Sequence, residues 1–529
     1  MAVSTSTFGI VILIYLMVIF YLGWLGYKRT CKDDDYMVAG RKIHPFILAL
    51  SYGATFISTA AIVGFGGVAG SLGMGLLWLV FMNIFVGIFI AFAIFGPKTR
   101  RIGQNLSAVT FPELLGKRFE SRFIQGFSGA LIGVFMPLYA GIVLIGAARF
   151  IETALGVHYD IAVLIFTIIV AAYVITGGLI AVMYTDALQG FLMFIGMGIL
   201  LVFTYRILGG INQAHQSLTE LGHLVPQALV QGGHQGWTMM PELGSPIWWT
   251  MVSTIILGVG IGVLAQPQLA VRFMTVESDK SFNRAIFVGG PFILMMAGVA
   301  YITGALSNVY FFENFGQIAL EIAGGNTDLI IPMYINNAMP DAFVILFMLV
   351  LLAASMSTLS SQYHTMGTSI GHDFYRGYLL SGKAGRTVNI TRLGIAVTIL
   401  ISVIFAYFLP ISIIARATAI FFGLCAAAFL PIYAGALFWK RMTREGAIAG
   451  LIVGTLSSLF WLTFVHAANA VPLGISEFIF STETVITGTW TLVDPILIAT
   501  PLAAIAAIVV SLITEPPSDE HLEWCYGKS

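Results

Sequence analysis

The feature that most constrains this chain is a succession of apolar segments, each long enough to cross a lipid bilayer. About 20 mostly apolar residues make a helix that spans the hydrocarbon core. About thirteen segments meet this length, with soft boundaries: 8–27, 44–72, 74–97, 122–153, 158–177, 179–209, 246–271, 283–310, 340–370, 389–409, 411–438, 444–467 and 491–514. The sequence therefore predicts an all-α integral membrane protein, with residues 1–529 forming a single transmembrane domain.

The composition agrees with a protein whose main solvent is lipid. Only 9% of the residues are charged and 58% are hydrophobic, whereas a soluble domain carries about 25% charged residues. The net charge is zero, which does not favour nucleic acid as a partner. Cys31, Cys425 and Cys525 are scattered, so neither a disulfide framework nor a zinc site is supported. The lipid bilayer and a small-molecule substrate are the partners we expect, and no obligate protein partner is evident.

The basic residues give the segments a direction. If the N-terminus lies outside and the segments alternate, all but three of the 25 lysines and arginines fall on the inner side. The exceptions, Arg149, Arg206 and Arg416, lie near outer helix ends. The inner set includes Arg272, Lys280, Arg284, Lys383, Arg386, Arg392 and Lys528. By the positive-inside rule, we expect a multi-pass plasma-membrane protein with its C-terminus in the cytoplasm.

Two of the segments are interrupted by glycine or proline. Segment 44–72 contains Gly53 and a glycine cluster from Gly64 to Gly67, and segment 246–271 contains the step Gln266-Pro267-Gln268. They lie five segments apart and so run in opposite directions, as an inverted five-plus-five repeat requires. Broken membrane helices free backbone carbonyls and often mark a binding site. The alternative is that the glycines only allow close packing.

Segment 340–370 offers oxygen ligands. Ala354, Ser357 and Thr358 are spaced i, i+3, i+4 and therefore share one helix face. Sodium is a hard cation that prefers oxygen, so hydroxyls facing a broken helix could complete a sodium site. The alternative is that these hydroxyls bond their own helix or bridge to a neighbour.

Three ionisable residues inside the segments are candidates for function. Asp186 is costly at this depth and is a functional candidate by default, unless it caps a helix at the interface. His364 could relay protons, although a packed, hydrogen-bonded histidine is the more common case. Arg416 could attract an anionic substrate or extend to the outer surface.

Four motifs in order resemble the sodium:solute symporter family over nearly the whole chain. They are Asp34-Asp35-Tyr36-Met37-Val38-Ala39-Gly40-Arg41; the run from Thr110 to Phe119; Gly177-Gly178-Leu179-Ile180-Ala181-Val182 with Thr185, Asp186 and Gln189; and the run from Ala354 to Ser360. The resemblance implies the leucine-transporter fold, with alternating access around a central site. One helix would precede the ten-helix core and two would follow it, the repeats covering 44–209 and 246–438.

The resemblance also implies ion sites. Sodium, the only cofactor expected, would be bound by the carbonyls of Ala54, Ile57 and Ala354 and by the hydroxyls of Ser357 and Thr358. Members similar to sialic acid transporters hold a second sodium. Its matching positions here are Asp186, Ser360 and Ser361.

The substrate cavity implied by the resemblance is apolar with a few polar groups. Its residues would be Phe56, Ile57, Ser58, Thr59, Tyr139, Val259, Val263 and Gln266. Proline-transporting members carry aromatic residues where this chain has Val259 and Val263, and the run from Pro267 to Arg272 looks closer to pantothenate and monocarboxylate symporters. We therefore predict a sodium-coupled symporter that imports a small organic acid of that kind.

Other functions stay open at this point. One is a sodium-coupled carrier of proline or another amino acid. A proton-coupled carrier and an uncoupled channel or sensor on the same fold are further alternatives. No catalytic triad, metal cluster or paired carboxylates are evident in the sequence, so an enzyme is not expected.

Overall fold

The computed structural model describes residues 5–380, 387–409 and 414–527, and this part of the chain is helical without a β-strand. Lys383, Arg386 and Lys528, three of the predicted inner charges, lie outside the described residues. Eleven helices in the described part are long and apolar enough to cross a membrane, and one bent pair would add a twelfth. The protein is therefore an all-α, multi-pass membrane protein, as the apolar segments predict.

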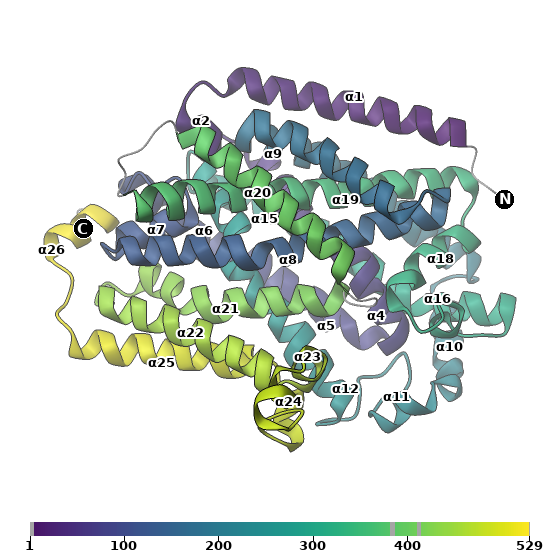
Figure 1. The fold of residues 1–529 in the computed structure, drawn as a ribbon. Helices are drawn as coiled ribbons and strands as arrows, with labels where there is room; N and C mark the ends of the chain where they lie inside the picture. Colours follow the sequence, from purple (N-terminus) through teal and green to yellow (C-terminus); the bar gives the residue numbers. More distant parts are fainter. Residues whose placement is uncertain (1–4, 381–386, 410–413, 528–529) are drawn as a thin grey trace.

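Most of the long helices lie side by side (Figure 1). The helices that cross as single rods are α1 (Thr5–Arg29), α8 (Arg122–Leu155), α19 (Asp341–Thr368), α20 (Thr387–Phe408), α21 (Ile414–Phe438), α22 (Arg444–Phe464) and α25 (Ile496–Ile513). Composite crossings include α5 (Leu77–Ile84) to α6 (Gly96–Asn105) and α15 (Lys280–Ile293) to α16 (Val299–Phe315). Helices α22 and α25 pack along one side, and α1 packs on α9 at the opposite side (Figure 1).

Helix α9 (Tyr159–Ile207) contains two of the predicted segments. Its 49 residues would extend about 74 Å, more than twice the hydrocarbon thickness of about 30 Å. Gly178, with φ 60° and ψ −160°, interrupts it between segments 158–177 and 179–209. Helices α1 and α25 both end at the same end of the bundle (Figure 1), as an odd number of crossings requires. The count of thirteen stays a prediction that this break favours.

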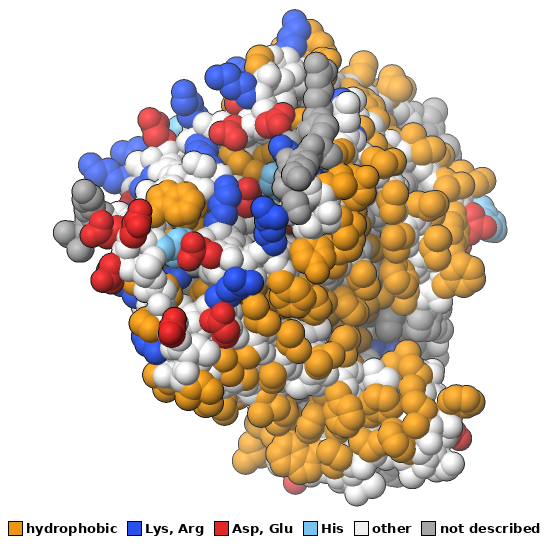
Figure 2. All heavy atoms as spheres, turned by 60° about the vertical axis from the view of Figure 1, so that its left-hand side comes forward, with side chains coloured by type: hydrophobic (Ala, Val, Ile, Leu, Met, Phe, Trp, Pro, Cys, Tyr) orange, Lys and Arg blue, Asp and Glu red, His pale blue; other side chains and the backbone are white. Residues whose placement is uncertain are grey.

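The charged side chains gather at one end of the molecule. Figure 2 shows lysine, arginine, aspartate and glutamate together at this end, while hydrophobic side chains cover the adjoining flank. Helices α7 (Phe111–Arg118) and α26 (Asp519–Tyr526) lie at this end in Figure 1. This separation of charged end and apolar flank is what a bilayer requires of a spanning protein.

At the other end, the connection after α9 forms short helices that cover the bundle. They are α10 (Ile211–Glu220) and α11 (Gln227–Gln231). The Trp237 indole is buried and donates to the Gly70 carbonyl at 3.1 Å. The Met74 N–H in turn donates to the Trp237 carbonyl at 2.6 Å. The connection is thereby fixed onto α4 (Phe65–Leu72).

Two helices are broken within the segments that the sequence indicates, the second of them at the indicated Gln266-Pro267 step. Helix α3 (Pro45–Phe56) ends at Ile57, whose φ of −90° and ψ of 102° are extended, and the chain resumes as η2 (Ala60–Gly64) and α4 after a bend of 54°. The second is η6 (Thr250–Val259), which continues through α13 (Gly260–Gly262) and η7 (Val263–Ala265) and stops at Gln266, where φ is −71° and ψ is 116°. A residue before proline is pushed out of the helical region, so Pro267 explains this stop. The chain then forms α14 (Pro267–Ala270) and η8 (Val271–Thr275).

Candidate functional site

The predicted sodium residues of α3 and α19 meet at the end of the first broken helix. The Ser357 hydroxyl donates to the Ala54 carbonyl at 2.8 Å and to the Ala354 carbonyl at 3.2 Å. The Thr358 hydroxyl donates to the Thr55 carbonyl at 3.1 Å. Ala54, Ala354, Ser357 and Thr358 are completely buried. The break thus exposes α3 carbonyls to two hydroxyls of α19, which is a donor set suited to a hard monovalent cation.

Ile57, the remaining predicted ligand, lies directly at the break. Its N–H still bonds the Gly53 carbonyl at 2.9 Å and closes the last turn of α3. Its own extended conformation ends the helix, so its carbonyl is not committed to a helical hydrogen bond of α3. Ile57 is buried, with 1% of its surface exposed, and it directly precedes Ser58 and Thr59 of the predicted cavity.

A buried ion pair lies next to this cluster. The Arg272 Nη2 is 2.8 Å from Asp186 Oδ2, and both side chains have an exposed fraction of 0%. Arg272 also donates to the hydroxyls of Ser51 at 3.1 Å and Ser361 at 2.5 Å, and to the Gln268 carbonyl at 2.5 Å. The positive-inside pattern places Arg272 in an inner segment, and the structure adds that η8 turns its guanidinium into the bundle, where it is buried.

Asp186 collects hydroxyl donors as well as the guanidinium. Those on its two carboxylate oxygens come from Ser51, Thr55, Ser360 and Ser361, at 3.1–3.2 Å. The residue lies inside α9 and caps no helix end, so the interfacial alternative for Asp186 is excluded. The structure brings Asp186, Ser360 and Ser361 together, as predicted for a second sodium, but it also brings Arg272 to them.

The two clusters are joined through shared residues. Thr55 offers its carbonyl to Thr358, while its hydroxyl is 2.8 Å from the Ser361 hydroxyl. The Ser357 carbonyl accepts from Ser361 at 2.9 Å and from Ser360 at 3.0 Å. Because one side chain and one carbonyl belong to both clusters, a displacement at either is transmitted directly to the other.

The residues predicted for the substrate cavity are all buried, and several of them touch. The hydroxyls of Ser58 and Tyr139 are 3.4 Å apart, and the Thr59 hydroxyl donates to the Val143 carbonyl of α8 at 3.1 Å. Gln266 accepts a hydrogen bond from the Gln268 amide at 3.1 Å. Phe56, Val259 and Val263 supply apolar surface with exposed fractions of 5%, 3% and 0%.

Phe422 of α21, which the sequence did not indicate, packs against residues predicted for the substrate cavity. Its ring lies 6.4 Å from that of Phe56 and 5.5 Å from that of Tyr139, measured between centroids. Its backbone packs against Gly262, where an added Cβ would come within 2.5 Å of the Phe422 carbonyl oxygen. A phenylalanine in an apolar helix carries no pattern that separates a cavity residue from a lipid-facing one.

The two other ionisable candidates have ordinary structural partners. The His364 ring bonds the Tyr36 carbonyl at 2.9 Å and is buried, which is the packed histidine expected as the alternative to a proton relay. Arg416 donates to the Ala468 carbonyl at 3.2 Å, in the connection that follows α22. This contact agrees with the interpretation that Arg416 extends toward the outer surface.

The motif from Thr110 to Phe119 holds α7 against η11 (Ser369–Leu379), which continues α19. The Thr110 hydroxyl caps α7 by accepting from the Glu113 N–H and donates to Asp373 at 2.7 Å. Burial alone would raise the pKa of Glu113, but the His372 ring, the Lys117 ammonium and the Val109 N–H together lower it to about 2. Glu113 is therefore ionised at neutral pH and ties this helix to its neighbours.

Comparison with known proteins agrees with this geometry. The model of the sodium:solute symporter family matches residues 36–454. The chain belongs to the sodium:solute symporter family. It is not an enzyme but a membrane transporter, and sodium is the coupling ion that this family implies.

Relatives and a solved structure cover almost the full length of this symporter. It is 26% identical to the osmoregulated proline transporter OpuE of Bacillus subtilis over 96% of this chain and 94% of that protein. It is 28% identical to the high-affinity proline transporter PutP of the same organism, over 87% and 91%. A Na+-coupled sialic acid symporter solved in a substrate-bound outward-open state superposes with a TM-score of 0.75 at 18% identity, covering 97% of this chain and 98% of that one. This last likeness shows the shared fold.

Proposed function

We propose that this protein is a sodium/proline symporter that imports its substrate by alternating access. The observation that carries the proposal is the buried oxygen cluster between the broken helix α3 and α19, beside the buried aromatic and polar residues predicted for the substrate cavity. The proline transporters among its relatives, including a sodium/proline symporter of Staphylococcus aureus that is 27% identical over 90% of this chain, favour proline over the monocarboxylate or pantothenate-like acid that the sequence first indicated.

The cavity supports proline in a way that the sequence did not predict. The argument against proline was that Val259 and Val263 stand where aromatic residues are expected. Phe422 brings an aromatic face from α21 to the same place, stacked near Phe56. A pyrrolidine ring needs an apolar wall of this kind, while the Ser58 hydroxyl and Gln266 amide can bond its charged groups.

Sodium would act by joining two helices that belong to opposite predicted repeats. Bound among the Ala54 carbonyl and the hydroxyls of Ser357 and Thr358, it would replace hydroxyl–carbonyl hydrogen bonds by ion–oxygen contacts. The resulting rigid end of α3 would shape the cavity, so sodium and proline each tighten the binding of the other. With the N-terminus outside, a potential of 100 mV adds about 2.3 kcal/mol of drive per sodium.

The second cation of the site is, in this proposal, Arg272 itself. The groups predicted for a second sodium already have other partners. Arg272 contacts the Asp186 carboxylate and the Ser361 hydroxyl, and the Ser360 hydroxyl donates to Asp186. Burying both a sodium and an arginine against one carboxylate would leave an uncompensated charge, which is costly in a buried site. We therefore expect one sodium per cycle, and a second only where Arg272 withdraws.

The test is uptake into proteoliposomes with an inward sodium gradient and, separately, a matched potassium gradient. Labelled proline, pyruvate and pantothenate are compared. Sodium-dependent accumulation of proline with a sodium Hill coefficient near one supports the proposal. Accumulation of pyruvate or pantothenate instead would favour the organic-acid substrate that the sequence first indicated. A sodium Hill coefficient near two would favour a second sodium site.

The same vesicles separate the other carriers. Accumulation driven by a proton gradient without sodium would contradict the sodium site and favour a proton-coupled carrier. Currents far above carrier turnover would favour a channel. Protease access to an N-terminal tag in right-side-out vesicles tests the predicted orientation.

A further inference from the structure

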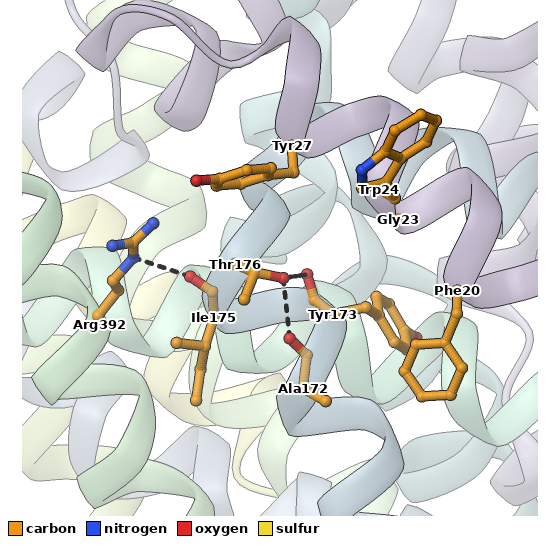
Figure 3. A pocket seen from close by; sticks show the side chains of 9 residues that line it. All are labelled: Phe20, Gly23, Trp24, Tyr27, Ala172, Tyr173, Ile175, Thr176 and Arg392. Carbon is orange, nitrogen blue, oxygen red and sulfur yellow. Dashed lines mark hydrogen bonds between the residues drawn. The ribbon is translucent and has the colours of Figure 1, made fainter.

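A pocket of about 460 Å³ lies on the flank of the bundle, away from the central site. It is formed by α1, by α9 just before the Gly178 break, and by Arg392 near the start of α20 (Figure 3). This volume is within the range of small-molecule sites, about 300–1,000 Å³. The pocket therefore has room for a headgroup and the first part of a chain.

The wall on α1 is aromatic for a simple helical reason. Phe20, Trp24 and Tyr27 are spaced i, i+4, i+7 and share one face. Gly23, on that same face, lets α1 approach α9, because an added Cβ would lie 3.2 Å from the Tyr173 Cβ. The three rings remain exposed by 43%, 47% and 54%. They are placed to contact a lipid chain on the flank.

The opposite end of the pocket is polar and positive. The Arg392 Nε donates to the Ile175 carbonyl at 2.9 Å, an oxygen that also accepts from the Tyr36 hydroxyl at 3.3 Å. None of the described residues that line the pocket carries a carboxylate. Lys28, stacked 3.8 Å over the Trp24 ring, adds a second positive charge nearby. Figure 3 shows the Tyr27 hydroxyl turned toward the side of Arg392, with Phe20 and the Tyr173 ring at the other end.

We propose that this pocket binds an anionic phospholipid. The phosphate would be bonded by the outer nitrogens of Arg392, a fork that matches two phosphate oxygens, and by the Tyr27 hydroxyl. One acyl chain would follow Phe20 and Trp24. The arrangement of a fixed cation at one end and an apolar wall at the other selects an amphiphile over a free phosphate ion.

The test is lipid retention by the full-length protein, measured by native mass spectrometry after exchange into mixed phosphatidylcholine and phosphatidylglycerol. Arg392→Gln should lower phosphatidylglycerol retention about fivefold, the effect of one basic residue near an anionic surface. Arg392→Lys should retain part of it, because the charge remains and the fork is lost. Arg284→Gln is the matched control, since Arg284 is exposed and also lies near the start of its spanning helix, four residues into α15 where Arg392 is five residues into α20.

Two further arms keep the result decisive. If Arg392→Gln does not yield folded protein, Tyr27→Phe and Trp24→Ala address the same pocket from α1 and should each weaken retention. Equal retention in Arg392→Gln and Arg284→Gln would overturn the proposal. Displacement of phosphatidylglycerol by millimolar inorganic phosphate would also overturn it, because the site would then recognise the free ion.

Discussion

Removing one partner of the Asp186–Arg272 pair should cost far more than removing both. The exposed fraction of each side chain is 0%, so no water can replace a lost charge. In Asp186→Asn the guanidinium keeps its hydroxyl and carbonyl acceptors but loses its counter-ion. Breaking a buried pair in this way costs about 3–5 kcal/mol. In Asp186→Asn with Arg272→Gln, both charges are gone and most hydrogen bonds can be remade, so we expect the double variant to recover at least about 2 kcal/mol of that loss.

The assay is thermal unfolding of the purified protein in one detergent, in sodium chloride and in potassium chloride. Arg272→Gln leaves the Asp186 carboxylate with its serine and threonine hydroxyls, which is the set predicted for a second sodium. This variant should therefore be stabilised by sodium more strongly than the unmodified protein, since a ligand bound only by the folded state stabilises it. Its sodium Hill coefficient in uptake should rise from near one toward two.

Arg118→Gln is the matched control for this experiment. Arg118 is also completely buried, but its hydrogen bonds go to the Tyr526 hydroxyl and the Lys440 carbonyl instead of to a carboxylate. It should lose stability without gaining a sodium response. The reasoning is refuted if the double variant is no more stable than Asp186→Asn alone, or if sodium stabilises Arg272→Gln and Arg118→Gln equally.

Three other outcomes follow from the structure. Ser357→Ala with Thr358→Ala should reduce sodium-dependent uptake at least tenfold by removing both hydroxyl ligands, about 1.4 kcal/mol or more, and uptake that keeps its sodium affinity would contradict the sodium site. Glu113→Gln should make the stability of the protein less dependent on pH at low pH. The pKa of the Glu113 carboxyl is lowered to about 2 in the folded protein, so its ionised form stabilises the fold at pH values above the pKa of the unfolded chain, and this stabilisation, on the order of 3 kcal/mol, is lost as the pH falls. The melting temperature of the unmodified protein should therefore fall more steeply between pH 5 and 3 than that of the variant. Gly178→Ala should cost about 1–3 kcal/mol in thermal unfolding, since φ 60° with ψ −160° is a conformation that only glycine adopts readily, and an unchanged melting temperature would mean that the break relaxes without cost.

Local periodicity and chain breakers were enough to predict much of the architecture. The oxygen face of α19 could be predicted because Ser357 and Thr358 follow Ala354 at helical spacing, whereas Ala54 and Ile57 were indicated only by the family resemblance. The turn inside α9 could be predicted because Gly178 stands between two apolar runs of spanning length. In each case the physical cause acts within a few residues, so it is visible along the sequence.

Contacts that depend on how distant helices meet could not be predicted in this way. Arg272 is followed in the sequence by Lys280 and Arg284, and a basic residue near a helix end is normally a surface residue. Only the inward turn of η8 after Pro267 brings its guanidinium to Asp186. Phe422 likewise reaches Phe56 and Tyr139 because Gly262 lets α21 pack against the second broken helix, and this depends on the packing of two segments far apart in the chain.

Thr55 couples the predicted sodium site to the buried Asp186–Arg272 pair, because it contacts residues of both. Its carbonyl accepts from Thr358 in the sodium cluster, while its hydroxyl reaches Ser361 and Asp186 in the other. Arg272 bonds Ser361 and Asp186 and also Ser51 of α3, so it holds α3, α9 and α19 together. In the proposed mechanism, release of sodium would remove the ion that orders the end of α3 at Thr55 and Thr358, and would next weaken the hydrogen bonds that hold Arg272 in place. The loss of one ion would then loosen three helices from two predicted repeats, which is the displacement that alternating access requires.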